Sequence, residues 1–369
     1  VKIMLARSWW VLAWVAARAS GDSEAVAREL SAKTSGDSEA AARKVMAKLL
    51  SDVVETKTAL QRQENPTMDN PFVFFHQRKA GGSSVRRMIV ASAERHKLSY
   101  WVPCFHGTGC NSYDPPLNRP YAIYGGHIYY PSVIKALMQH KLKHPNSDPP
   151  RPKFACFTVF REPVSRVESC WDFRFRGAEP QFRTFAAEEV DRILPSAMSI
   201  WAEGCNNEPL RILSDSGRAE EKVNTLTSGA DDAIDGADGW AIDAVGTLAR
   251  TIEHMQPCVV GVLERCEETQ LVANFYFPWL QFDCGLRVNV NNRNKQHTTV
   301  PLPGAVEAVV RRHNALEVLA YEAANIMLDA QLKVVNRTLR SEGLPSRATN
   351  NVTNVRQRWR RLPGGTVYM

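Results

Sequence analysis

The sequence predicts an α/β protein whose core is an open parallel sheet flanked by helices. Short and almost wholly apolar runs, rich in aromatic and β-branched residues, recur from Pro71 onward. Each run is followed by a polar or glycine-containing turn, and each turn is followed by a helix-like stretch. Apolar runs of this length are typical of parallel strands that are buried on both faces. We therefore expect ligands to bind beyond the carboxyl ends of these strands.

Four runs are too short for helices and are predicted to be strands: Phe72–Phe75, Tyr121–Tyr124, Phe154–Phe160 and Val259–Leu263. The predicted crossover helices are Val85–Glu94, Ser132–His140, Val164–Phe175 and Glu267–Phe275. A longer amphipathic helix is expected over Gly304–Ala330. The segment Thr227–Gly239 is rich in Gly, Asp and Ala and is expected to be a solvated insertion.

The composition excludes several classes of protein. With 44% hydrophobic and 23% charged residues, the chain is neither collagen-like, wholly disordered nor a polytopic membrane protein. Its 46 Lys and Arg against 39 Asp and Glu give a net charge of +7, which favours anionic partners. The eight cysteines form neither a dense disulfide framework nor a paired zinc pattern. Cys104, His106 and Cys110 lack a clear fourth ligand, so we expect no metal and favour disulfides.

Four regions are expected along the chain. Residues 1–19 have a basic start, a short apolar run and an A-x-A-like end, which indicate a signal peptide or a truncated signal anchor. Residues 20–70 contain a near-duplicated Ala- and Glu-rich segment and are expected to form an exposed helical stem. Residues 71–335 form the globular domain, and residues 336–369 form a basic, flexible tail. These features predict a protein of the secretory pathway.

The first candidate site follows the first strand, at Lys79-Ala80-Gly81-Gly82-Ser83-Ser84. Glycines allow the backbone to approach a phosphate, and the N–H groups at the start of a helix point toward it. Lys79 adds a mobile positive charge. A Walker P-loop places its lysine after the second glycine, whereas Lys79 precedes both glycines, so the pattern indicates a phosphate site without supporting an ATPase.

The second candidate site follows the third predicted strand. Arg161 stands at its carboxyl end, and Ser165 and Ser169 lie four residues apart on the helix that follows. A guanidinium and a hydroxyl at this edge can bind the oxygens of one phosphate. The alternative is a structural arginine that is paired with Glu162 or Glu168.

Together, the two sites resemble the membrane-bound carbohydrate sulfotransferases, and within them the heparan sulfate 6-O- and 2-O-type enzymes. The resemblance lies in a strand, H-x-x-K-x-G-G-[ST]-[ST] and a helix, followed about eighty residues later by a strand and R-[DE]-P-V-x-R-x-x-S. Weaker similarities are Asn206-Asn207 and the strand end at Val259–Arg265. Three residues depart from the family pattern: Arg78, Ala80 and Glu162.

The resemblance implies a P-loop-like nucleotide-binding sulfotransferase fold and a Golgi location. It implies that the donor co-substrate is 3′-phosphoadenosine 5′-phosphosulfate (PAPS). Lys79 and the turn Ala80–Ser84 would bind the 5′-phosphosulfate, and Arg161 and Ser169 would bind the 3′-phosphate.

Sulfuryl transfer also needs a base, or at least a hydrogen-bond acceptor, for the hydroxyl that receives the sulfuryl group. It further needs a positively charged group beside the bridging oxygen of the departing nucleotide. Lys79 can supply the charge. His127 follows the apolar strand Tyr121–Tyr124 and should emerge at the same edge as Lys79 and Arg161, so we predict that it is the base. His106 is the alternative base, and a site without a histidine base is the third possibility.

The predicted function is transfer of a sulfuryl group from PAPS to a hydroxyl of a glycan. One alternative is a sulfotransferase of a small molecule or peptide. A second is a non-catalytic binder of acidic polysaccharide or nucleic acid, for which the basic charge alone would suffice. Such a binder has no need of Lys79 before two glycines or of Arg161 spaced eight residues from Ser169, so we expect no nucleic-acid partner.

Overall fold

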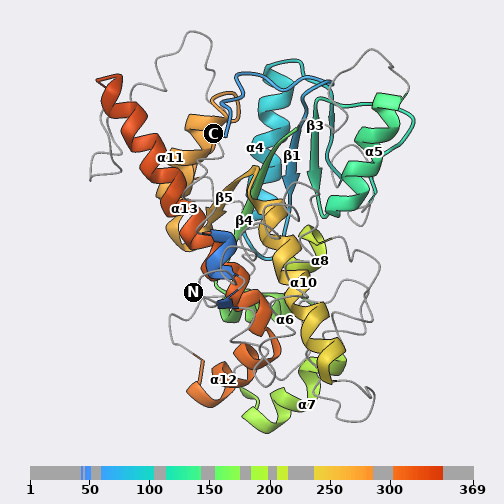
Figure 1. The fold of residues 1–369 in the computed structure, drawn as a ribbon, viewed down its shortest axis with the longest axis vertical. Helices are drawn as coiled ribbons and strands as arrows, with labels where there is room; N and C mark the ends of the chain where they lie inside the picture. The colour runs from blue at the N-terminus through green and yellow to red at the C-terminus, as the bar shows by residue number, and fades with distance from the viewer. Residues whose placement is uncertain are drawn as a thin grey trace, which may run out of the picture.

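The computed structural model describes residues 43–44, 46–50, 60–103, 114–142, 154–174, 184–197, 206–214, 237–285 and 302–343. Within them lies a five-stranded, all-parallel sheet in the order β2-β3-β1-β4-β5 (Figure 1). The strands are β1 (Phe72–Phe75), β2 (Tyr100–Trp101), β3 (Ile123–Gly126), β4 (Ala155–Phe160) and β5 (Cys258–Val262). The prediction of an open parallel α/β sheet is confirmed.

All four predicted strands are present: β1 has the predicted bounds, and the bounds of the other three are shifted by one or two residues. β3 begins two residues later than expected: the N–H of Tyr121 donates to the Tyr124 hydroxyl (3.0 Å) and not to a neighbouring strand. The strand continues to Gly126, which pairs with Phe75. The fifth strand, β2, was not predicted. It has only two residues, and so short an edge strand leaves no apolar run in the sequence.

The four predicted crossover helices are also present, as α4 (Gly82–Arg95), α5 (Tyr130–Leu142), α6 (Pro163–Arg174) and α11 (Cys266–Tyr276). The further helices are α7 (Ala187–Ala197), α8 (Glu208–Leu213) and α10 (Ala237–Met255), and a 3₁₀ turn, Leu263–Arg265, precedes α11. The expected solvated insertion, Thr227–Gly239, runs into α10, which begins at Ala237 and further along buries Val245, Leu248 and Ile252 in the core. The rest of that segment, 227–236, lies outside the described residues.

The long helix expected over Gly304–Ala330 is divided into α12 (Gly304–His313) and α13 (Ala315–Ser341). Asn314 separates them with φ −119° and ψ 30°, and its side chain donates to the Val310 carbonyl (3.0 Å). α13 continues past the boundary that was expected at residue 335, because the buried Val335 still packs on the core. The beginning of the expected flexible tail is therefore helical.

Two apolar clusters position the elements. The main cluster contains the sheet, with α4 next to β3, and with α11 and α13 packed on β5. The second cluster lies beyond the carboxyl end of β4 and joins α6, α7 and α12 through Val164, Val167, Val190 and Val310. These three helices form the lower end of the molecule in Figure 1, below the sheet. The carboxyl edge of the sheet therefore faces this helical group.

The end of the predicted stem packs against the globular domain. Met46 and Leu50 are buried in the main cluster, and Arg43 pairs with Glu322 of α13 (2.8 Å). The N–H of Gln63 donates to the Tyr276 carbonyl (2.8 Å). The expectation of an exposed stem is therefore wrong for these described residues, because their apolar side chains complete the core of the domain.

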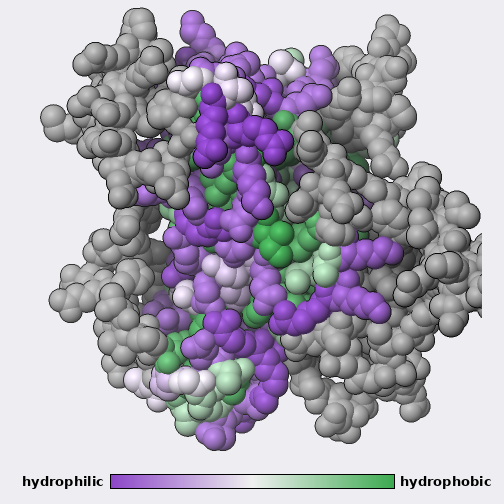
Figure 2. Space-filling model, turned by 60° about the vertical axis from the view of Figure 1, so that its left-hand side comes forward, coloured by the Kyte–Doolittle hydropathy of each residue, from purple (hydrophilic) through white to green (hydrophobic). Residues whose placement is uncertain are grey.

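Two disulfides lie within the described residues. Cys156–Cys258 joins the neighbouring strands β4 and β5, and Cys266–Cys284 closes the segment after β5. Cys104, His106 and Cys110 lie outside the described residues. The described helices include none with the length and apolar character needed to cross a membrane. Figure 2 shows that the face over α11 and α13 is mainly hydrophilic, with hydrophobic residues in several smaller areas between the hydrophilic ones.

Candidate functional site

The turn between β1 and α4 has the backbone conformation of an anion-binding helix start. Lys79 has φ 63° and Gly81 has φ 78°, both in the left-handed region. The first hydrogen bond of the helix runs from the Ser84 N–H to the Gly81 carbonyl (3.0 Å). The N–H groups of Gly82 and Ser83 precede this bond and point out of the helix end. Such groups and the helix dipole stabilise a bound anion.

Gly82, the second glycine of the turn, leaves room for the side chain of a neighbouring histidine. A Cβ atom at Gly82 would lie 1.7 Å from Cδ2 of His76, so any other residue would displace the imidazole. His76 is buried, and its ring stacks on His127 with 4.0 Å between centroids. Burial, assisted by the neighbouring His127 and by nearby cations, lowers the pKa of His76 well below its usual value. His76 is therefore neutral at neutral pH and adds no charge to the site.

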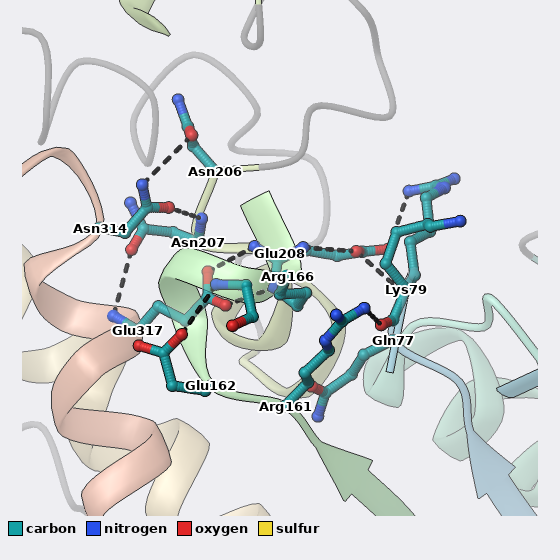
Figure 3. A network of polar contacts seen from close by, with 12 residues as sticks. Gln77, Lys79, Arg161, Glu162, Arg166, Asn206, Asn207, Glu208, Asn314 and Glu317 are labelled. Atoms are coloured by element: carbon teal, nitrogen blue, oxygen red, sulfur yellow. Dashed lines mark hydrogen bonds and ion pairs between the residues drawn. The ribbon is translucent and has the colours of Figure 1, made fainter. Parts of the chain in front are cut away.

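The two sequence motifs meet at the carboxyl edge of the sheet. β1 and β4 are adjacent parallel strands, and Arg161, directly after β4, donates from Nη1 to the Lys79 carbonyl (3.0 Å) (Figure 3). Glu162 instead accepts from the Arg311 guanidinium (3.0 Å) and from the Ser165 N–H (2.8 Å). The structure therefore brings Arg161 and Lys79 together, and gives Glu162 a separate role at the start of α6.

The Lys79 ammonium lies over an aromatic ring of α6. Its Nζ is 4.5 Å from the centroid of Phe173, an exposed side chain. Ser169 is half-buried four residues before Phe173, and residues at this spacing share one face of a helix. The Lys79 ammonium thus lies over the face of α6 that also carries Ser169. A cation–π contact at an exposed site contributes only about 0.5–1 kcal/mol, so Lys79 can leave the ring for an anionic ligand.

His127 stands directly after β3, at the edge that carries Lys79 and Arg161. Its Nδ1 lies 3.0 Å from the His76 carbonyl. A carbonyl oxygen only accepts hydrogen bonds, so in the neutral ring Nδ1 carries the proton and Nε2 carries the lone pair. This is the tautomer that a general base requires.

A buried charge network was not anticipated from the sequence (Figure 3). Glu208, at the start of α8, accepts hydrogen bonds from the Arg78 backbone N–H and from Arg78 Nη1, each at 2.9 Å. It is also 3.3 Å from Arg166 of α6, whose guanidinium forms two hydrogen bonds with Glu317 of α13, one of them at 2.6 Å. Burial disfavours the charge of Arg166, but Glu317 more than compensates and raises the pKa of Arg166.

An amide network extends these contacts toward α12 and α13. The Asn207 N–H donates to Asn314 Oδ1 (3.1 Å), and the Glu317 N–H donates to Asn207 Oδ1 (3.2 Å). Asn206 is buried beside them and accepts from the Asn314 side chain (3.3 Å). The Asn206-Asn207 pair singled out in the sequence therefore holds α8 against the C-terminal helices, as Figure 3 shows.

Three arginines near the turn are wholly or partly buried, at a cost in desolvation. Burial is the first cause that lowers the pKa of Arg161 and of Arg211, and it lowers the pKa of Arg86 to about 10. A guanidinium remains protonated at neutral pH, so burial here raises the free energy of a charged group. A bound anion would offset this desolvation. The arrangement thus favours phosphate or sulfate ligands over neutral ones.

Comparison with known proteins gives no assignment. No family model matches the sequence, and no curated protein matches it. Among the residues that the structure describes, no group of three or more His, Cys, Asp or Glu side chains could hold a metal ion. The functional conclusion therefore depends on the residues of the site.

Proposed function

We propose that the protein transfers a sulfuryl group from PAPS to a hydroxyl of a glycan acceptor. The observation that carries this proposal is the 3.0 Å hydrogen bond from Arg161 to the Lys79 carbonyl. It joins two motifs that are 82 residues apart in the sequence at one edge of the sheet, where α/β proteins bind their ligands.

PAPS fits the positive charges and the hydrogen-bond donors at this edge of the sheet. The N–H groups of Gly82 and Ser83 and the ammonium of Lys79 are suited to the 5′-phosphosulfate. Arg161, with Ser169 on the helix that follows it, is suited to the 3′-phosphate. A nucleotide that carries phosphate at both the 3′ and the 5′ position would use both motifs. A nucleotide with a 5′-phosphate alone would use only the first motif.

The chemistry requires one proton transfer and one bond exchange. His127 Nε2 accepts the proton of the acceptor hydroxyl as the hydroxyl oxygen forms its bond to sulfur. The bond between sulfur and the bridging phosphate oxygen breaks, and its electron pair remains on the departing 3′-phosphoadenosine 5′-phosphate. Lys79 neutralises the negative charge that develops on that oxygen. His127 and Lys79 thus act at opposite ends of an in-line displacement.

The disulfides Cys156–Cys258 and Cys266–Cys284 support a location in the secretory pathway, because disulfides persist in oxidising compartments. The proposed signal peptide or anchor, residues 1–19, lies outside the described residues. A glycan acceptor in the Golgi lumen is consistent with such a location.

Incubation of the full chain with ³⁵S-labelled PAPS and a panel of desulfated glycans, peptides and small molecules that carry hydroxyls tests the proposal. We expect label to transfer to at least one glycan and transfer to be roughly 10²–10³ slower in the Lys79→Ala variant. Transfer only to a peptide or small-molecule hydroxyl would establish the alternative sulfotransferase. If the chain binds glycans but transfers label to none of these acceptors, it is a polyanion binder and the proposal is wrong.

A further inference from the structure

We propose that Glu208 is a positioning residue that sets the proton affinity of His127 and fixes the loop preceding Lys79, an inference that rests on the proposed function. Three contacts carry it. Glu208 Oε1 lies 3.9 Å from Nδ1 of His127, while the same carboxylate holds both the backbone and the guanidinium of Arg78. One acidic side chain therefore contacts the segment before Lys79 and lies beside the predicted base.

The carboxylate is rigidly held. The side chain of Glu208 is only 1% exposed, and those of Arg78 and His127 are each 12% exposed. Because Arg166 is fixed by Glu317 of α13, its 3.3 Å contact also restrains Glu208 from the side opposite the loop. A buried carboxylate with partners on both sides has little freedom to move away from His127.

The charges around His127 give Glu208 a distinct electrostatic role. Cations face this region from several elements: Arg78 and Lys79 in the loop after β1, Arg86 on α4, Arg166 on α6 and Arg211 on α8. His76, stacked on His127, is neutral. Glu208 Oε1 lies 3.9 Å from Nδ1 of His127, whereas Glu317 pairs with Arg166. A nearby carboxylate stabilises the imidazolium that forms when His127 accepts a proton.

The charge balance explains why Arg78 is tolerated in a position where the resembling family has an uncharged residue. Arg78, Arg166, Glu208 and Glu317 form a continuous network of two cations and two anions. Without Glu208, Arg78 would add repulsion against a protonated His127. The Arg78–Glu208 pair thus offsets the charge of Arg78 beside His127, and Lys79 and Arg161 are the cations proposed to bind the donor.

Two variants separate this role from a purely structural one, because they shift the proton affinity of His127 in opposite directions. Glu208→Gln keeps an oxygen to accept from the Arg78 N–H but removes the negative charge, so the pKa of His127 should fall. Arg78→Met removes the competing cation and leaves Glu208 ionised, so the pKa of His127 should rise. NMR titration of ¹³C-labelled histidines in the full chain measures both, and the spectrum of His127→Ala assigns the resonance. The matched control is Glu322→Gln, which removes the charge of a surface carboxylate paired with Arg43 and should leave the His127 titration unchanged.

Turnover provides the second measurement. Glu208→Gln should lower turnover on the order of 10-fold, less than the 10²–10⁴ associated with loss of a base, with little change in the affinity for 3′-phosphoadenosine 5′-phosphate. The acid limb of its pH profile should move to lower pH, and that of Arg78→Met to higher pH. If Glu208→Gln does not fold, the NMR titration of Arg78→Met alone tests the inference, through the expected rise in the pKa of His127. Unchanged or same-direction shifts in the folded variants would overturn the inference, whereas failure of nucleotide binding in wild type would overturn the proposed function instead.

Discussion

Replacing His127 by alanine is expected to lower turnover by about 10²–10⁴ and to leave donor binding near normal. The reason is the tautomer that the His76 carbonyl imposes, which places the proton on Nδ1 and the lone pair on Nε2. Wild-type activity should also fall in acid as His127 becomes protonated and can no longer accept the proton of the hydroxyl. The His127→Ala variant should lack this limb. Steady-state rates across pH, combined with nucleotide titrations, measure both effects.

His254 provides a matched control. Its Nδ1 also contacts a backbone carbonyl, that of Leu213 (2.5 Å), and its ring also stacks on an aromatic side chain, Tyr130. His254→Ala therefore removes a comparable set of contacts from a residue outside the proposed mechanism and should keep turnover close to wild type. If His127→Ala kept full turnover while His106→Ala lost it, the base would be His106. If both kept it, the reaction would use no histidine base.

Replacing Lys79 by alanine is expected to lower turnover by roughly 10²–10³, because in the proposed function the ammonium neutralises charge that develops on the departing nucleotide. Donor affinity should fall less, because Arg161 and the N–H groups of the turn, the other proposed nucleotide ligands, are kept. Lys79→Met is the companion variant, since it keeps the length of the side chain without its charge. Turnover and the dissociation constant of the nucleotide, measured on the same preparations, separate the two contributions.

Lys97 controls for the unusual backbone of Lys79. Both residues have positive φ, 56° for Lys97 and 63° for Lys79, and Lys97 is exposed beyond the other end of α4. Lys97→Ala should therefore leave turnover unchanged although its backbone strain is similar. Equal losses in the two alanine variants would mean that the effect of Lys79 comes from the backbone and not from its charge.

The sheet could be predicted from the sequence because its strands are buried on both faces. A run such as Phe72–Phe75 is apolar at every position, and its four side chains are all buried. Elements without this pattern were missed or wrongly bounded. β2 has only two residues, and the break at Asn314 depends on hydrogen bonds with Val310 and Asn207, which no local periodicity reveals.

The same distinction applies to the site. Lys79, Arg161 and His127 could be predicted at one edge because each follows a recognisable strand, and the carboxyl ends of parallel strands meet. Glu208 could not be predicted as a partner of Arg78, because 130 residues separate them and neither lies in a periodic pattern. The one signal in the sequence for such a partner was Arg78 itself, a charged residue in the loop between β1 and α4. An arginine beside Lys79, at the edge of the sheet where it is partly covered, favours an acidic partner from elsewhere in the chain.

In the proposed function, Arg161 at the end of β4 and the turn after β1 together bind a nucleotide that has a phosphate at both its 3′ and its 5′ position. Calorimetric titration of the full chain with 3′-phosphoadenosine 5′-phosphate and with 5′-AMP tests it most directly. A charge-assisted hydrogen bond contributes about 1.5–3 kcal/mol, so the first nucleotide should bind at least about 10-fold more tightly. Arg161→Ala should abolish that preference. Equal affinities of wild type for the two nucleotides, or a preference that survives in Arg161→Ala, would contradict the account.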